Sequence, residues 1–333
     1  MTKLDYSNHL KKKDFDIEKE YKKIFASLFK LIKDCSTREE FINNKIDIFD
    51  DSKDKSLQEI FTKFKEKKID EFDVIFQNKD LEDILTLNQN EIIKILEKNK
   101  DKSSLRKFKY VFNYDKFQSE ITKFFTDNFD FRTCFYCNKD FITNFDSDKF
   151  ESNKEVSTFQ LDHFYDKGTY PYLALSFYNL IPSCPTCNSS KVKGSANTFE
   201  NNCIAPNSEK FDFHQKVKFK LLLDDSCKNL HIKSKDDIQI NLKENYSDMY
   251  DKYMEIFKLN ERYKAHKDIV FEMIQKAELY PESRLKELEN LTGIPFQQIK
   301  KDIFNLIDEE EEDLSKQPFS KLIVDMSKEL EIL

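Results

Sequence analysis

Two short cysteine turns limit how this chain can fold: Cys134-Phe135-Tyr136-Cys137 and Cys184-Pro185-Thr186-Cys187. Two residues between the thiolates allow both sulfurs of one turn to reach the same ion, and two such turns complete a tetrahedral set of four thiolates. A closed set leaves no coordination position for a reaction, so the pattern predicts a structural zinc ion held by Cys134, Cys137, Cys184 and Cys187. A redox dithiol is the alternative, but two turns that flank a loop-rich segment favour zinc.

The other cysteines do not suggest a disulfide framework. The chain has seven cysteines, an odd number, and four of them lie in the two turns. In a reducing compartment this distribution indicates metal ligation. Cys35, Cys203 and Cys227 have no comparable partners in the sequence and are expected to be ordinary buried thiols.

Between the two turns, Phe159-Gln160-Leu161-Asp162-His163-Phe164 is expected to be a strand that presents a carboxylate and an imidazole next to each other. An isolated Asp-His pair is more often an incidental hydrogen-bonded couple than a reactive one. Here the pair is followed by Asn179-Leu180-Ile181-Pro182-Ser183, the second cysteine turn and Asn188-Ser189-Ser190-Lys191. This ordered set, rather than any one member of it, indicates a chemical function.

The order and spacing of these residues, from about Cys134 to Gly194, resemble the motif of HNH nucleases, also called ββα-metal endonucleases. The resemblance implies a module of two strands and a helix that hydrolyses phosphodiester bonds in nucleic acid, with DNA favoured over RNA on this ground alone. It implies that Asp162 is a metal ligand, that His163 is the general base, and that Asn179 fixes the loop and orients His163.

Three further positions follow from the same resemblance. Asn188 stands where the family often has a histidine, and an asparagine there also occurs; its side-chain oxygen is the expected second ligand of the catalytic ion. Lys191 matches a basic position that would touch the phosphate backbone, although a solvent-facing lysine fits the sequence nearly as well. Gly194 is expected to end the short helix that carries Asn188 and Lys191.

The chemistry of phosphodiester hydrolysis gives a reason for this pattern. The reaction needs an activated water, stabilisation of charge on the phosphoryl oxygens and help for the leaving 3′-oxygen. A neutral histidine can accept the proton of water near neutral pH. A single hard cation can serve the phosphate and the leaving oxygen. Because Asn188 offers oxygen instead of imidazole nitrogen, Mg²⁺ or Mn²⁺ is expected rather than Zn²⁺ or Ni²⁺.

A wider resemblance concerns the setting in which such a protein works. The stretch from Asp166 to Tyr178 is similar to bacterial HNH proteins of antiphage and mobile-element systems, including the nuclease subunits of Septu-type defence, which work with an ATPase partner. Asn260-Glu261-Arg262-Tyr263 and Pro318-Phe319-Ser320-Lys321-Leu322 are also similar to segments of such proteins. The sequence has no Walker A motif, so any ATP-dependent control is expected to come from another protein.

The charge of the chain does not by itself indicate nucleic-acid binding. The net charge is -7, and the residues from Phe129 to Glu200 include more acidic than basic side chains. A bound divalent ion, another surface or a partner would therefore have to hold the phosphate backbone.

The protein is expected to be soluble and cytoplasmic, without membrane contact. No apolar stretch approaches the roughly 18 residues that a membrane span needs. The segment from Met1 to Lys13 is polar and lacks the apolar core of a signal peptide.

The chain is expected to be an α+β protein with three ranges: a helical region at 1–128 for partner or substrate recognition, the nuclease module with its zinc knuckle at 129–202, and a mostly helical α+β region at 203–333. With 32 Phe and no Trp, phenylalanine is expected to fill much of the core. Apolar stripes predict N-terminal helices at Ile17–Ile32, Ile42–Phe49, Leu57–Phe64, Leu81–Leu96 and Phe117–Phe125.

In the last range, strands are expected at Val217–Leu223 and Ile238–Leu242, with Leu230–Ile232 as a third candidate. One long helix is expected from Tyr253 to Ile274, a shorter one ended by Gly293, and a final one at Leu322–Leu333. The acidic run Asp308–Asp313 is expected to be an exposed loop or helix end.

Two other functions remain open at this stage. One is a zinc-stabilised module that binds nucleic acid or protein without catalysis. The other is a nuclease subunit that cuts only in complex with an ATPase or another partner, an option that the acidic balance leaves open.

Overall fold

The computed structural model describes residues 1–29, 81–99, 112–147, 154–225, 227, 232–245, 247–307 and 313–332. The predicted helices at Ile42–Phe49 and Leu57–Phe64, Cys35 and most of the acidic run from Asp308 lie outside these residues, as does most of the candidate strand Leu230–Ile232.

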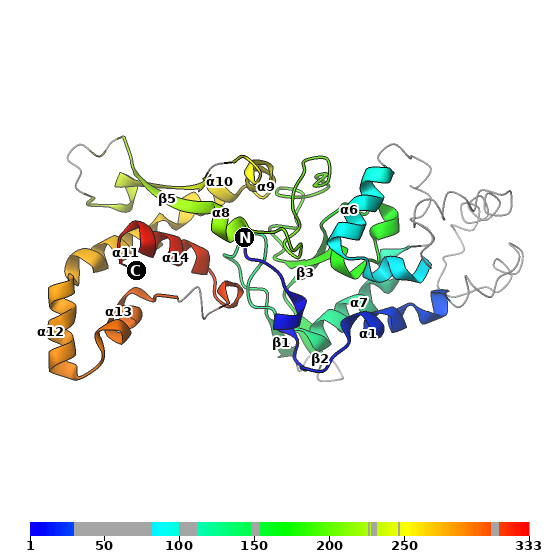
Figure 1. Cartoon of the computed structure of the whole chain (residues 1–333), viewed down its shortest axis with the longest axis horizontal. Coiled ribbons are helices and arrows are strands. Elements are labelled where there is room, and N and C mark those ends of the chain that lie inside the picture. The colour runs from blue at the N-terminus through cyan, green and yellow to red at the C-terminus, as the bar shows by residue number, and fades with distance from the viewer. Residues whose placement is uncertain are drawn as a thin grey trace, which may run out of the picture.

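The fold combines helices with small antiparallel sheets, which confirms the α+β class. The described part is elongated: the N-terminal helices lie at one end, the β3–β4 pair lies near the middle, and strands β5 and β6 lie with helices α11 to α14 at the other end (Figure 1). Most buried apolar side chains, from Met1 to Ile332, belong to one continuous cluster, and Ile307, Leu314 and Val324 form a second, small one. The division into three ranges stays a prediction.

In residues 1–29, 81–99 and 112–128 the N-terminal part is helical, as the apolar stripes there predict. Asp16 caps the first helix by accepting from the Lys19 amide, and Asn88 and Glu91 form a capping box before another. Its elements are η1 (Tyr6–His9), α1 (Ile17–Ile24), η3 (Leu81–Thr86), α6 (Gln89–Lys98) and α7 (Tyr114–Asn128).

Aromatic side chains join these helices to the centre of the molecule. The Phe177 ring lies 4.5 Å from Tyr6, 5.1 Å from Tyr21 and 5.1 Å from Phe125, measured between ring centroids. Such aromatic pairs stabilise the folded state by more than the burial of their apolar area alone. Phe177 therefore anchors the segment that leads to Asn179.

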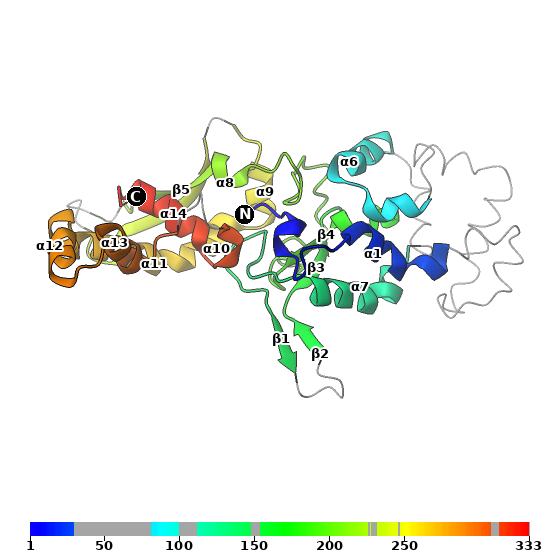
Figure 2. The same ribbon diagram turned by 60° about the horizontal axis from the view of Figure 1, so that its bottom comes forward.

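The central part contains two antiparallel hairpins. Strands β1 (Asn144–Ser147) and β2 (Lys154–Ser157) form a hairpin that projects from the body (Figure 2). The sequence analysis did not predict it, because its short, mostly polar strands show no clear alternation. Strands β3 (Gln160–His163) and β4 (Leu180–Ser183) pair with His163 opposite Leu180. Two short helices, η5 (Pro171–Leu173) and η6 (Phe177–Asn179), lie in the loop between β3 and β4.

After β4 the chain forms a series of turns, so the predicted short helix that would carry Asn188 and Lys191 is wrong. Residues 185–194 are rich in Ser, Thr and Asn, whose side chains compete for backbone groups. The Ser189 hydroxyl, for example, donates to the Thr186 carbonyl. The series ends at Gly194 with a φ of +51°, and a Cβ there would lie 3.3 Å from the Ser190 Cα. The helix of a complete ββα module is therefore not present in this segment.

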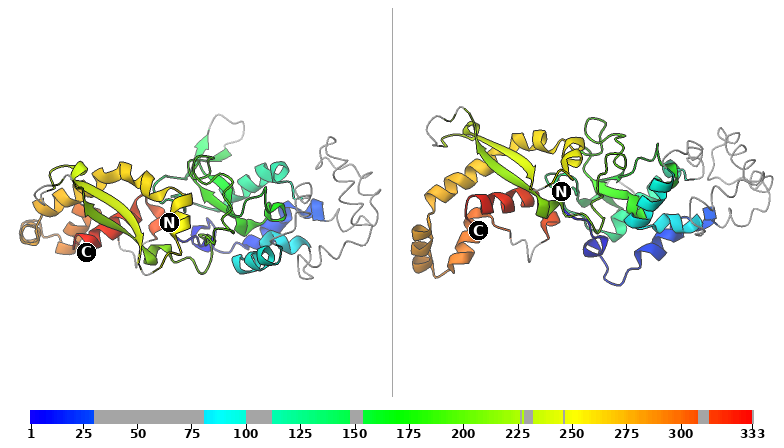
Figure 3. Two further views of the ribbon diagram at one scale, coloured as in Figure 1. Left: turned by 90° about the horizontal axis from the view of Figure 1, so that it is seen from above. Right: turned by 45° about the horizontal axis from the view of Figure 1, so that its top comes forward.

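The C-terminal part packs helices around one long hairpin (Figure 3). Helix α14 packs against β5, and α11 packs against β6. Its elements are α8 (Phe213–Lys216), β5 (Val217–Leu223), η7 (Lys235–Asp237), β6 (Ile238–Glu244), α9 (Asp251–Ile256), α10 (Leu259–Tyr263), η8 (Lys264–His266), α11 (Lys267–Leu279), α12 (Glu282–Thr292), α13 (Phe296–Phe304), η9 (Leu314–Lys316) and α14 (Ser320–Glu329).

The single long helix predicted from Tyr253 to Ile274 is instead broken into α9, α10, η8 and α11. The break occurs at Lys258, which has a left-handed φ of 52°. This turn lets Phe257 and Leu259, on either side of it, both be fully buried. Gly293 ends α12 with a φ of 70°, as the sequence predicts.

Within the described residues, every helix falls short of the length and apolar character that crossing a membrane would require.

Candidate functional site

The four cysteines of the two turns come together in one buried cluster. Their sulfur atoms all lie within 4.8 Å of one another, and the Cys137 and Cys184 sulfurs are 3.9 Å apart. A tetrahedral ion with Zn–S bonds of about 2.3 Å would separate its sulfurs by about 3.8 Å. The donor set therefore fits a structural zinc ion.

Local backbone contacts fix the conformation of each cysteine turn. Asn138, which follows the first turn, has a φ of 51°, a conformation that asparagine tolerates better than most residues. Its amide donates to the Cys134 carbonyl over 2.7 Å. In the second turn the Cys187 amide lies 3.4 Å from the Cys184 sulfur.

Two residues of α10 support the zinc cluster from the C-terminal part. Arg262 Nη1 lies 3.0 Å from the Cys187 sulfur, and Nη2 lies 3.2 Å from Asp140 Oδ2. The Tyr263 hydroxyl donates to the Cys137 carbonyl over 2.6 Å. Burial opposes the Arg262 charge, but the nearby Cys187 and Cys137 outweigh that effect and raise the pKa of Arg262. A guanidinium here offsets part of the net negative charge that four thiolates leave on a zinc ion.

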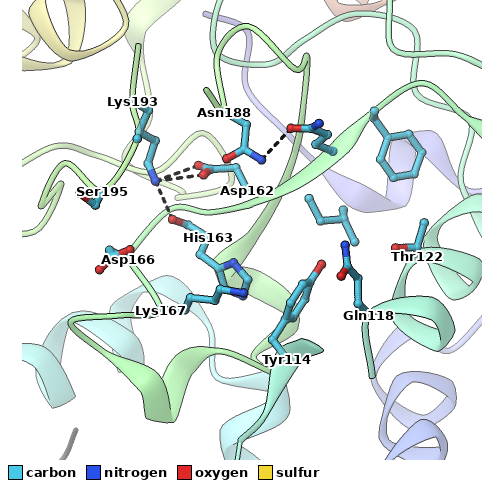
Figure 4. Close-up of a pocket in the computed structure, with 14 residues that line it drawn as sticks. Tyr114, Gln118, Thr122, Asp162, His163, Asp166, Lys167, Asn188, Lys193 and Ser195 are labelled. Carbon is cyan, nitrogen blue, oxygen red and sulfur yellow. Dashed lines mark hydrogen bonds and ion pairs between the residues drawn. The ribbon is translucent and has the colours of Figure 1, made fainter. Parts of the chain in front are cut away.

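Asp162 and His163 are neighbours on β3, and their side chains form contacts in different directions, as alternation along a strand requires. The Asp162 carboxylate meets the zinc knuckle and the Lys193 ammonium, whereas the His163 ring lies against Tyr114 of α7. Both residues line the same pocket (Figure 4).

The His163 ring is held in one tautomer. Its Nε2 lies 2.9 Å from the Ala174 carbonyl oxygen, which can only accept, so Nε2 carries the proton. Burial lowers the pKa of His163 to about 4, so the ring is neutral at neutral pH. In the described part of the chain no group donates to Nδ1 of this ring. The Nδ1 lone pair is therefore available as a base.

The Asp162 carboxylate has two protein partners. Lys193 Nζ lies 3.1 Å from Oδ1 and 3.0 Å from Oδ2, and the Tyr136 hydroxyl donates to Oδ2 over 2.6 Å. Lys193 is only 3% exposed and also donates to the His163 carbonyl over 2.7 Å. Lys191, the basic residue that the resemblance indicates, is exposed and does not line the pocket.

Lys193 and Tyr136 were missed at the sequence level. A buried lysine cannot be told from a solvated one by its type, and Tyr136 looked like a spacer between two zinc ligands. A usable signal for Lys193 was its place directly before Gly194, where the chain turns back toward β3.

Asn179 is fully buried and bonded on both sides of its amide. Its oxygen accepts from the Tyr165 amide over 2.8 Å, and its nitrogen donates to the carbonyls of Tyr165 and Leu173, each over 3.1 Å. It thus ties the end of β3 to the residue that precedes Ala174.

Asn188 is half-buried, and its orientation is set by Gln160. The Asn188 amide nitrogen donates to Gln160 Oε1 over 3.0 Å, and among the residues that the structure describes none donates to the Asn188 oxygen. Figure 4 shows that oxygen on the side of Asp162.

The pocket is a cavity of about 560 Å³ between β3, the turns after β4, and α7. Tyr114, Gln118 and Thr122 supply the α7 wall at a spacing of four residues, which is one face of a helix. At its edge, Lys167 forms an ion pair with Asp115 over 2.9 Å and lies 4.7 Å from the centre of the Tyr114 ring.

The pocket offers few protein atoms that could hold a divalent cation. An ionised carboxylate has about four lone-pair positions. Lys193 uses one on each oxygen of Asp162 and Tyr136 uses a second on Oδ2, so one position remains on Oδ1. Together with the open Asn188 oxygen this set fits Mg²⁺, which commonly keeps several waters and takes substrate phosphate oxygens as ligands.

Comparison of the chain with protein-family models, with curated proteins and with solved structures finds no match.

Proposed function

We propose that this protein is a metal-dependent nuclease of the HNH type, which hydrolyses phosphodiester bonds in nucleic acid, with DNA as the substrate. The observation that supports this most is the state of His163: a neutral ring with Nε2–H bonded to a carbonyl and Nδ1 open, in a pocket that also contains Asp162 and Asn188. DNA rather than RNA rests on the resemblance to HNH nucleases.

In the proposed reaction, His163 Nδ1 accepts a proton from a water molecule as that water attacks the phosphorus. The Ala174 carbonyl holds the ring in place and stabilises the positive charge that the ring gains. Asn179 fixes the loop that carries this carbonyl. The roles of Ala174 and Asn179 rest on hydrogen bonds that are already present in the folded chain.

Asp162 Oδ1 and the Asn188 oxygen would hold one Mg²⁺ or Mn²⁺ ion. When bound, such an ion stabilises negative charge on the phosphoryl oxygens and on the leaving 3′-oxygen. Gln160 accepts from the Asn188 amide nitrogen, which turns the Asn188 oxygen away from Gln160. Lys193 holds the Asp162 carboxylate in place through contacts to both of its oxygens.

A second candidate is the same nuclease in a form that cuts only when a partner is bound. The net charge of -7 argues against strong DNA binding by the chain alone. The C-terminal part also exposes large apolar side chains, among them Leu279, Leu291 and Ile294. An ATPase partner and a role in antiphage defence rest on the resemblance to Septu-type proteins.

The test is a nicking assay on supercoiled plasmid with added Mg²⁺ or Mn²⁺, comparing the natural chain with His163→Ala. His266→Ala is a matched control, since His266 is half-buried and lies outside the pocket. We expect nicking by the natural chain and by His266→Ala, and its loss in His163→Ala with unchanged zinc content.

Absence of cutting by all three proteins, each with a full zinc complement, would rule out a nuclease that works alone. Equal cutting by the natural chain and His163→Ala would rule out His163 as the base.

A further inference from the structure

A buried chain of polar contacts joins the zinc knuckle to the strand that carries His163. It runs from the Tyr136 hydroxyl to the Asp162 carboxylate, and from there to the Lys193 ammonium and the His163 carbonyl. The side chains of Asp162 and Lys193 are 4% and 1% exposed, so this ion pair is almost fully buried at the wall of the pocket. Burial of two charges is costly unless both are fully hydrogen-bonded.

Lys193 meets that requirement by using all of its hydrogen-bond donors. An ammonium has three donors, and Nζ has three oxygen acceptors: both Asp162 oxygens and the His163 carbonyl. Lys193 therefore has no free donor for a substrate phosphate. Instead it links the side chain of one strand residue to the backbone of the next, which fixes the orientation of the dipeptide Asp162-His163.

Tyr136 fixes the same carboxylate from the other side. Its backbone lies between the zinc ligands Cys134 and Cys137, and its ring stacks on Phe257 with 4.2 Å between centroids. The ring is fully buried, so the hydroxyl has little freedom to leave Asp162. The position of Asp162 thus depends on the shape of the first cysteine turn.

We propose that Lys193 and Tyr136 are positioning residues, which hold Asp162 and His163 in their working orientation and couple it to the zinc knuckle. This inference rests on the nuclease function proposed above. It assigns the zinc site a part in the alignment of the base, in addition to its part in folding.

Three variants separate this role from a general effect on the fold. Lys193→Met keeps the length of the side chain and removes the charge. Tyr136→Phe removes one hydroxyl and keeps the ring stack on Phe257. Lys191→Met makes the same change as the first variant at an exposed lysine two residues away.

We expect kcat for plasmid nicking to fall about 10- to 100-fold in Lys193→Met and about 10-fold in Tyr136→Phe. KM should stay within about twofold and the zinc content should stay at one ion per chain, because neither residue contacts the substrate. Lys191→Met should match the natural chain in kcat. If Lys193→Met fails to fold, Tyr136→Phe alone tests the positioning role. This variant keeps the ion pair between Lys193 and Asp162.

A second measurement does not depend on cutting. The ring-nitrogen chemical shifts of His163, assigned with His163→Gln, should change in Lys193→Met and Tyr136→Phe and stay the same in Lys191→Met. If the natural chain does not cut, the proposed nuclease function fails. The chemical shifts of His163 would still test whether Lys193 and Tyr136 position its ring. The positioning role is overturned if Lys193→Met and Tyr136→Phe, both with zinc bound, change neither the His163 shifts nor kcat. If the natural chain does not cut, unchanged His163 shifts in these two variants overturn it alone.

Discussion

At the scale of single residues, the pKa of a histidine depends on what surrounds its ring. His9 is 6% exposed and lies between the rings of Phe131 and Phe135. Burial lowers the pKa of His9 below its usual 6.5, although Asp313, 3.8 Å from Nε2, opposes the shift. In the unfolded chain the residue is solvated and binds a proton more readily.

This difference predicts a pH dependence of stability. Because the folded state binds fewer protons at His9, the free energy of unfolding should fall as the pH drops through the unfolded pKa of about 6.5. Urea unfolding of the zinc-bound chain between about pH 8 and about pH 5 measures the slope. His9→Gln, which cannot titrate, should show a shallower slope; an equal slope in both proteins would contradict the prediction.

The sequence indicated the residue types of the site better than their partners. Cys-x-x-Cys spacing is a local property, so the four cysteines of the buried cluster could be identified before the fold was known. The partners of Asp162 come from positions 26 residues before it and 31 residues after it in the chain, and no local pattern marks such contacts.

At the scale of elements, the loop from β3 to β4 determines where Ala174 offers its carbonyl. Asn179 forms three hydrogen bonds in this loop and is fully buried. Asn179→Ala would remove the side-chain partner of the buried Tyr165 amide and carbonyl, while the Leu173 carbonyl would keep the Ser176 amide. We expect a loss of about 2–4 kcal/mol in the free energy of unfolding.

Asn188→Ala is the matched control for that prediction. It removes one contact to the exposed Gln160 and should cost less than about 1 kcal/mol, while lowering metal-dependent cutting. Denaturant unfolding of the two variants side by side tests the contrast, and equal losses would show that the loop does not depend on Asn179.

Helices of this chain were predictable where an apolar stripe coincides with capping residues, as at α1 and α6. Prediction failed where backbone conformation depends on distant packing. The turn at Lys258 exists because Phe257 stacks on Tyr136, far away in the sequence, and β1 and β2 lack the alternation that would mark them.

At the scale of the whole molecule, the zinc cluster is a junction between distant segments. Arg262 and Tyr263 of α10 reach the two cysteine turns, and Asn138 Oδ1 accepts from the Ser320 hydroxyl and the Lys321 amide at the start of α14. Segments that lie far apart in the sequence thus meet around one cluster.

Removal of zinc should therefore loosen more than the knuckle. We expect a strong chelator to raise amide hydrogen exchange in α10 and in the first turn of α14. Exchange in α12, which lies farther along the C-terminal part, should change least. Unchanged exchange in α10 after complete zinc loss would contradict the role of the cluster as a junction.

The choice of phenylalanine and tyrosine as core residues has a practical consequence for spectroscopy. Because the chain contains no tryptophan, its intrinsic fluorescence comes from tyrosine, and many of its tyrosines are buried. A single tryptophan placed at the exposed Gln118 of the pocket wall would be the sole source of tryptophan emission. Quenching by a stacked base would then report the arrival of a nucleic acid strand at the pocket in real time.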